Sequence, residues 1–147
     1  MKPRVVIDTN AYSALMSGDV RIAELLSGAE EVIVPIAVLG ELHDGFRGGA
    51  RRKENEKLLA LFLSKSNVRV PDMTAESAER YGEIKDALRK AGHPVPTNDI
   101  WIAVQAAEAS ARVISFDRHF EYISGVGVDV ELLQHDGPAG PEPAKPL

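Results

Sequence analysis

Short apolar runs alternate with longer segments of helical periodicity along this chain. The runs are rich in valine and isoleucine and have the length and composition of buried strands. Between them, apolar residues recur every three or four positions, as on one face of an amphipathic helix. Strands that alternate with helices predict an α/β fold, with a mainly parallel central sheet in a three-layer α/β/α arrangement. The predicted strands are VVI at 5–7, VIV at 32–34, VRV at 68–70, RVISF at 112–116 and VDV at 128–130.

Helix boundaries follow from capping residues and glycines. We expect Asn10 to cap the first helix, over AYSALMSG, and Gly28 to close the second. Residues 98–111, NDIWIAVQAAEASA, are nearly all small or apolar, so this helix should lie deep in the core. The predicted helices cover residues 11–18, 19–26, 36–46, 47–66, 74–91 and 98–111, with a short one after Asp117.

The chain has 147 residues, which is enough for one compact domain with a real core. From His135 the composition changes, because HDGPAGPEPAKPL holds four of the nine prolines and almost nothing apolar. We therefore expect one domain over residues 1–134 and a flexible Pro/Gly-rich tail over 135–147.

Charge and composition narrow the function classes. The net charge of −5, from 17 basic and 22 acidic residues, argues against a protein that coats nucleic acid through bulk charge. It leaves open a nuclease that gathers carboxylates around a metal ion. The chain has no cysteine, no apolar run long enough to span a bilayer and no signal peptide pattern. We therefore expect a cytoplasmic protein with no membrane association.

Four carboxylates stand at positions whose neighbours are apolar. Asp8 directly follows VVI and Asp117 follows VISF, so both lie at carboxyl ends of strands, where parallel sheets bind ligands. Asp99 and Glu41 lie in otherwise apolar helices. If the four converge, their repulsion raises some of their pKa values, and a divalent cation such as magnesium removes the conflict. The waters that such an ion keeps are suited to phosphodiester hydrolysis.

Each carboxylate also has a simpler explanation. Asp8 and Asp117 can serve as helix caps, for which aspartate is a preferred residue. Asp99 can be a first-turn acid that the helix dipole favours, and Glu41 can face water on a mostly buried helix. These explanations together require four separate coincidences of placement, and this favours a shared site.

The ordered segments VVIDTNAY, VLGELHDGF, PTNDIWIA and ISFDRHF resemble the PIN-domain ribonucleases, and among them the VapC-type toxins of prokaryotic toxin–antitoxin pairs. The resemblance covers residues 4–134. It implies a PIN-like fold and an acidic quartet of Asp8, Glu41, Asp99 and Asp117. The family uses such a quartet to bind magnesium or manganese and to cut single-stranded or loop regions of RNA. Polar positions that often surround the site are occupied here by Thr9, Asn10, Asn98 and Ser115, for which we expect supporting or substrate-contacting roles.

The resemblance also implies partners: an RNA substrate, a cognate antitoxin and a second copy of the chain in a homodimer. The apolar early helices can supply the dimer or antitoxin surface, although ordinary core packing explains them equally well. The residues concerned are Leu15, Met16, Ile22, Leu25 and Leu26.

A basic cluster in GFRGGARRKENEK can guide an RNA backbone toward the acidic site. The alternative is a solvated loop and helix start, which is the commoner role of such charge clusters. The cluster consists of Arg47, Arg51, Arg52 and Lys53.

Two other classes remain open at this point. One is a phosphohydrolase with a strand-end aspartate as nucleophile, although Asn10 stands where such enzymes carry their second aspartate. The other is a non-catalytic module that binds RNA or protein. His119 lies close to Asp117, but we interpret it as a surface or packing histidine.

Overall fold

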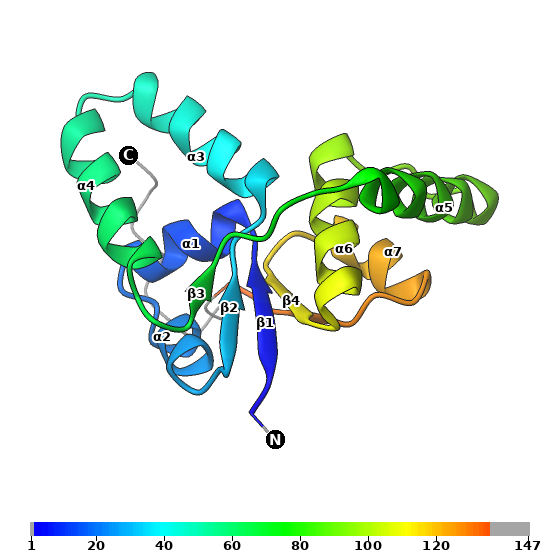
Figure 1. Cartoon of the computed structure of the whole chain (residues 1–147), viewed down its shortest axis with the longest axis horizontal. Coiled ribbons are helices and arrows are strands. Elements are labelled where there is room, and N and C mark those ends of the chain that lie inside the picture. The colour runs from blue at the N-terminus through cyan, green and yellow to red at the C-terminus, as the bar shows by residue number, and fades with distance from the viewer. Residues whose placement is uncertain (1, 136–147) are drawn as a thin grey trace.

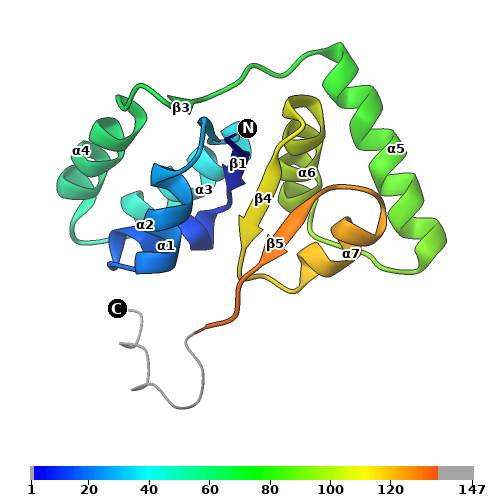
Figure 2. The ribbon, with the colours of Figure 1, turned by 90° about the horizontal axis from the view of Figure 1, so that it is seen from below.

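The computed structural model describes residues 2–135 and contains a five-stranded parallel sheet with the strand order β3-β2-β1-β4-β5. Figure 1 labels β3, β2, β1 and β4, and β5 is labelled in Figure 2. The chain therefore starts in the middle of the sheet, adds two strands on one side and then crosses to the other. The predicted fold class is confirmed. The strands are β1 (Arg4–Ile7), β2 (Glu31–Ile33), β3 (Val68–Arg69), β4 (Arg112–Ser115) and β5 (Val130–Leu132).

The central strand β1 is apolar because both of its faces are covered. Val6 pairs with Ile33 of β2 on one side and with Val113 of β4 on the other, and all three side chains are fully buried. A parallel strand covered on both faces reads as a continuous apolar run, which is the pattern of VVI.

Helices cover the sheet on both sides. Figure 2 shows α1, α2 and α4 on one side of the molecule and α5 and α7 on the other, with β1, β4 and β5 between them. The helices are α1 (Thr9–Met16), α2 (Val20–Ser27), α3 (Ile36–Arg47), α4 (Arg52–Leu63), α5 (Ala75–Ala91), α6 (Thr97–Ala109) and α7 (His119–Gly125).

The predictions were wrong at several element ends. The first helix is capped by Asp8 and not by Asn10, because Asp8 is the last extended residue and its side chain accepts the N–H of Ala11. The predicted helix 47–66 begins only at Arg52, since α3 runs on to Arg47 and a glycine turn separates the two helices.

The last strand begins two residues later than predicted, at Val130. Gly127 has a φ of +101°, and the N–H of Val128 donates to the carbonyl of Ile123 at 3.4 Å. Val128 therefore belongs to the turn that closes α7, although its side chain is buried as a strand residue's would be.

Helix α6 lies deep in the core, as its composition predicted. Six of its residues are buried, and one of them is the polar Gln105. The Gln105 Nε2 donates to the carbonyl of Pro71 at 3.1 Å, and its Oε1 accepts the N–H of Ile36 at 3.3 Å. This side chain therefore ties α6 to the start of α3 and to the segment that precedes α5.

Within residues 2–135, no helix combines the length and apolar character needed to cross a membrane. The predicted tail falls almost entirely outside the described residues, so the domain boundary at residue 134 stays a prediction.

Candidate active site

The order of the sheet reverses between β1 and β4, and parallel α/β sheets bind ligands at such a switch point. Asp8 directly follows β1, and Asp117 lies two residues beyond the end of β4. The sheet therefore brings the two strand-end carboxylates to the same edge, as the sequence predicted.

Asp8 is held by hydrogen bonds to both of its carboxylate oxygens. Oδ1 accepts the backbone N–H of Ala11 at 2.8 Å, and Oδ2 accepts a short hydrogen bond from the hydroxyl of Ser115. The side chain is buried, and this burial raises its pKa. The two hydrogen bonds lower the pKa, whereas the nearby charges of Asp117 and Glu41 raise it further.

Ser115 links the two strand-end carboxylates. Its hydroxyl donates to Asp8 and accepts the backbone N–H of Asp117 at 2.9 Å. Because the hydroxyl has a single proton, which goes to Asp8, the orientation of this bridge is fixed. Ser115 was predicted as a polar neighbour of the site, and the structure places it there fully buried.

Asp99 lies in the first turn of α6 and turns a buried oxygen toward the cluster. Its Oδ2 is buried and has no hydrogen-bond partner among residues 2–135. The pKa of Asp99 is raised to about 7, chiefly by burial and also by the charge of Asp117, while His119 opposes the rise. A buried carboxylate oxygen without a partner is costly unless a proton or a cation meets it.

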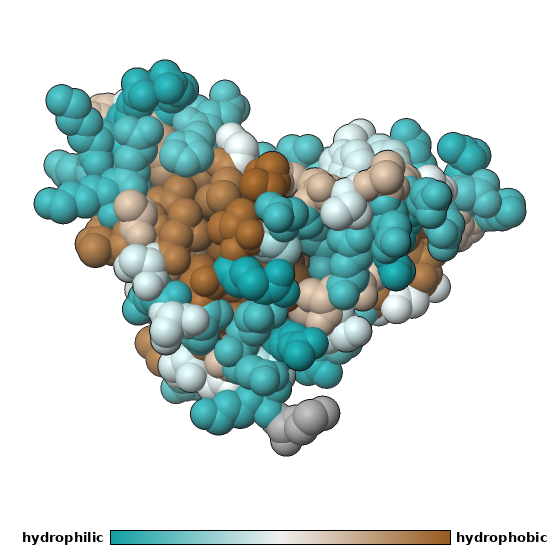
Figure 3. All heavy atoms as spheres, in the orientation of Figure 1, coloured by the Kyte–Doolittle hydropathy of each residue, from teal (hydrophilic) through white to brown (hydrophobic). Residues whose placement is uncertain are grey.

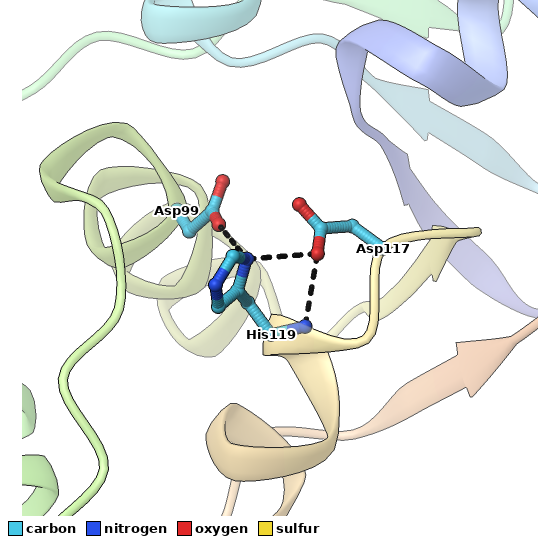
Figure 4. A group of neighbouring side chains, drawn as sticks. All are labelled: Asp99, Asp117 and His119. Atoms are coloured by element: carbon cyan, nitrogen blue, oxygen red, sulfur yellow. Dashed lines mark hydrogen bonds and ion pairs between the residues drawn. The ribbon is translucent and has the colours of Figure 1, made fainter.

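His119 completes this part of the site (Figure 4). Its Nδ1 lies 2.9 Å from Oδ1 of Asp117 and 3.9 Å from Oδ2 of Asp99. Ligand atoms of these three residues all lie within 4.8 Å of one another, close enough to hold one metal ion. The sequence interpretation of His119 missed this position, and the only signal for it was the two-residue spacing from Asp117.

Glu41 is the exposed member of the quartet. It lies in the middle of α3, and its Oε1 accepts a hydrogen bond from the Thr9 hydroxyl at 3.1 Å. Its charge raises the pKa of both Asp8 and Asp99. The structure therefore brings the four predicted carboxylates into one electrostatic group, with Glu41 at its rim.

The simpler explanations hold alongside this convergence. Asp8 does cap α1, and Asp117 Oδ1 accepts the N–H of His119 at 2.9 Å, at the start of α7. Asp99 is the acidic residue in the first turn of α6, and Glu41 faces water. Capping and clustering are compatible because the helices begin directly beyond the strand ends.

The basic cluster lies at the turn between α3 and α4, at the end of α3 away from the strand ends (Figure 1). Arg47 lies six residues, or about 9 Å of helix, beyond Glu41. Among residues 2–135 no ion pair joins the cluster to the four carboxylates, so its role in RNA binding stays a prediction. Arg51 is paired with Glu54, and Arg52 with Glu56. Arg47 and Lys53 are exposed at the same turn, and Asn10 and Asn98 are exposed in the first turns of α1 and α6.

These residues fit a divalent cation. Asp99 and Asp117 offer carboxylate oxygens that lie within 4.8 Å of each other, and Oδ2 of Asp99 has no hydrogen-bond partner among residues 2–135. Asp8 lies close enough for its charge to raise the pKa of Asp99. Hard cations such as Mg²⁺ and Mn²⁺ prefer oxygen ligands of this kind. The repulsion that raises the pKa of Asp99 is what a bound cation would relieve.

A second feature is an apolar groove on the other side of the sheet from α6. It has a volume of about 730 Å³ and is formed by α1, α2 and α4 over β2 and β3. Figure 3 shows the hydrophobic surface on this face. The residues that line it include Leu15, Met16, Leu58, Leu61, Phe62 and Val68.

Fold and site together define a parallel α/β protein with an acidic centre at the switch point of its sheet. The chain belongs to the PIN domain family, whose profile matches residues 5–126. The family resemblance of the sequence is thereby confirmed.

Named relatives and solved structures agree with this assignment. The chain is 26% identical to Ribonuclease VapC5 of Mycobacterium tuberculosis, over 88% of this chain and 93% of the relative. It is also 26% identical to Ribonuclease VapC1 of Haemophilus influenzae strain R2866, over 81% of this chain and 91% of the relative.

Among solved structures, VapBC-1 from nontypeable Haemophilus influenzae matches with a TM-score of 0.75 and 24% identity, over 88% of this chain and 97% of that chain. A second match is VapBC-5 from Mycobacterium tuberculosis, a member of the VapBC family of toxin–antitoxin systems. It has a TM-score of 0.64 and 24% identity, over 90% of this chain and 98% of that chain. At this identity the structural likeness shows the fold.

Proposed function

We propose that this protein is a metal-dependent endoribonuclease and the toxin of a type II toxin–antitoxin pair. The observation that carries the proposal is the convergence of four carboxylates at the switch point, with a buried, unpartnered oxygen of Asp99 among them. The ribonuclease names of the relatives support the reaction class.

In this proposal Asp8, Asp99 and Asp117 hold Mg²⁺ or Mn²⁺. Bound there, the ion would offset charge on the phosphodiester and make an attacking water easier to deprotonate. Asp8 contributes a carboxylate whose orientation is fixed by Ala11 and Ser115. Glu41 is exposed and steadied by the Thr9 hydroxyl, so it can accept a proton from water at the rim of the site.

The proposal predicts that Asp99→Asn and Asp117→Asn abolish cleavage of a loop-containing RNA while the protein stays folded. Each substitution keeps the shape of the side chain but removes a charge, and we expect the rate to fall by about 100-fold or more. The measurement is gel-based cleavage by purified protein in Mn²⁺ or Mg²⁺, with circular dichroism to monitor the fold. The matched control is Asp86→Asn, an exposed aspartate of α5 that pairs with Lys90.

The same experiment separates the alternatives. Undiminished cleavage in either variant, or in excess chelator, contradicts the proposal. A binding module retains RNA without cutting it in every variant, and an aspartate-nucleophile phosphohydrolase forms a covalent phosphoenzyme that this mechanism lacks.

We also propose a cognate antitoxin as the partner. The likeness to VapBC-5 supports this, because that protein belongs to a family of toxin–antitoxin systems. The apolar groove is the surface we assign to an apolar segment of that partner, since exposed leucines at its rim have no cover among residues 2–135. A homodimer, which the sequence resemblance implied, stays a prediction.

A further inference from the structure

We propose that His119 is a nitrogen ligand of the divalent-cation site and makes this site favour Mn²⁺ over Mg²⁺. The inference rests on the proposed function, because it concerns the same cation. It adds a residue outside the acidic quartet and a metal preference that the quartet alone does not dictate.

The first argument is the direction of the imidazole. Both close contacts of the ring, to Asp117 and to Asp99, are made by Nδ1 (Figure 4). This nitrogen therefore points at the space between the two carboxylates. One atom from each of the three residues can meet a common ion without a large rearrangement, since these atoms lie within 4.8 Å of one another.

The second argument is that the backbone under the ring is fixed. The N–H of His119 donates to Oδ1 of Asp117 at 2.9 Å, and the next residue, Phe120, is fully buried. Helix α7 is thus anchored beneath the histidine. The His119 side chain is 46% exposed, so an ion and its waters can approach it from solvent.

The third argument is the chemistry of the donor set. Mg²⁺ prefers oxygen ligands and retains several waters in a near-octahedral shell. Imidazole nitrogen suits first-row transition metals, and Mn²⁺ accepts both nitrogen and carboxylate oxygen. Adding the imidazole of His119 to the carboxylates of the proposed site therefore favours Mn²⁺ more than the carboxylates alone do.

The alternative role of His119 is that of a counter-cation. Its protonated ring would then occupy the place of the ion between Asp117 and Asp99 and would withdraw when an ion binds. The two roles make opposite predictions, because removal of a ligand weakens Mn²⁺ binding, whereas removal of a competing cation strengthens the binding of both ions.

The test uses metal-free full-length protein and His119→Ala. Pulsed electron paramagnetic resonance of bound Mn²⁺ should show coupling to a ¹⁴N nucleus in the wild type and none in the variant. By titration calorimetry, we expect the Kd for Mn²⁺ to rise about tenfold in the variant and the Kd for Mg²⁺ to change by less than about threefold.

His43→Ala is the matched control. His43 is 50% exposed and its Nδ1 lies 3.7 Å from Glu56 Oε2, so it is also a surface histidine beside a carboxylate, but it lies outside the cluster. We expect this variant to keep the ¹⁴N coupling and both affinities. A second variant, His119→Asp, restores a ligand through oxygen and should shift the preference toward Mg²⁺.

Bound Mn²⁺ without ¹⁴N coupling in the wild type overturns the inference, as does coupling that persists in His119→Ala. Equal tightening of Mg²⁺ and Mn²⁺ in His119→Ala overturns it in favour of the counter-cation role. The proposed function is judged separately by RNA cleavage. Asp99-dependent cleavage without ¹⁴N coupling refutes the inference alone, and ¹⁴N coupling without cleavage refutes the proposed function alone.

Discussion

At the scale of single residues, Asp8 shows how one side chain serves both the fold and the site. It ends an apolar strand, caps α1 through Oδ1 and faces the carboxylate cluster. The sequence could predict this position, because an acid directly after a buried strand is conspicuous. It could not predict the bond from Ser115 or the approach of His119, since both depend on how β4 and α7 lie beside β1.

The raised pKa of Asp99 predicts a pH dependence of stability in the metal-free protein. The pKa of this carboxyl is about 7 in the folded state, against 3.8 for an unperturbed aspartate, so between these values the folded protein binds more protons than the unfolded one. The free energy of unfolding should therefore fall as pH rises from about 4 to about 7. Urea unfolding in chelator at pH 5, 6 and 7 measures this slope.

Asp99→Asn should make this slope clearly shallower, although the raised pKa of Asp8 leaves part of it in place. Asp86→Asn serves as the control, because Lys90 lowers the pKa of that exposed carboxyl and its removal leaves the Asp99 contribution intact. An identical slope in wild type and Asp99→Asn would show that Asp99 titrates normally.

At the scale of elements, sequence patterns located the helices and strands well and their ends less well. The buried character of α6 followed directly from its small and apolar residues. The errors lie where two sequence signals point to different structures. Asp8 caps the helix that Asn10 was expected to cap, and Val128 has the composition of a strand residue but closes a turn. The role of Gln105 was also hidden, because its two partners lie 69 and 34 residues away along the chain.

Gln105→Met tests how α6 holds its neighbours. The substitution keeps the volume of the side chain but leaves the N–H of Ile36 and the carbonyl of Pro71 without their partner. We expect the free energy of unfolding to fall by about 1–3 kcal/mol, because two part-buried polar groups lose a hydrogen bond. Chemical denaturation measures this loss.

Since Ile36 begins the helix that carries Glu41, RNA cleavage should also weaken in the fraction of Gln105→Met that remains folded. The matched comparison is Gln134→Met, the same change at an exposed glutamine, which should alter the free energy of unfolding by less than about 0.5 kcal/mol. If Gln105→Met proves as stable as the wild type, the tie between α6 and α3 contributes nothing measurable.

At the scale of the whole molecule, the strand order decides where chemistry can occur. Alternating strands and helices predicted a parallel sheet in three layers, and the motif order predicted the family. The pattern alone did not give the order of the strands, because crossover connections leave no local signal in sequence. The apolar groove could not be predicted from any one segment either, because five elements contribute residues to it.

Leu61→Lys tests the groove as the antitoxin surface. Leu61 lines the groove and is 58% exposed, so the change should alter stability by less than about 0.5 kcal/mol. Binding of the co-expressed cognate antitoxin should weaken about tenfold or more, because a charge would enter an apolar contact. Calorimetry with the purified pair measures this affinity.

Val20→Lys provides the comparison, because Val20 is 66% exposed but is not among the residues that line the groove. It should leave antitoxin affinity unchanged. Equal affinity of Leu61→Lys and wild type would place the partner elsewhere on the molecule.

The hydroxyl of Ser115, which joins the end of β4 to Asp8, has a consequence for how the protein is made. The first carboxylate emerges from the ribosome early, but its partners on α6 and beyond β4 follow about a hundred residues later. A polypeptide interrupted before Ser115 carries only fragments of the centre. On the proposed function, the product therefore cannot damage the RNA of the cell that makes it until α6 and β4 have been synthesised.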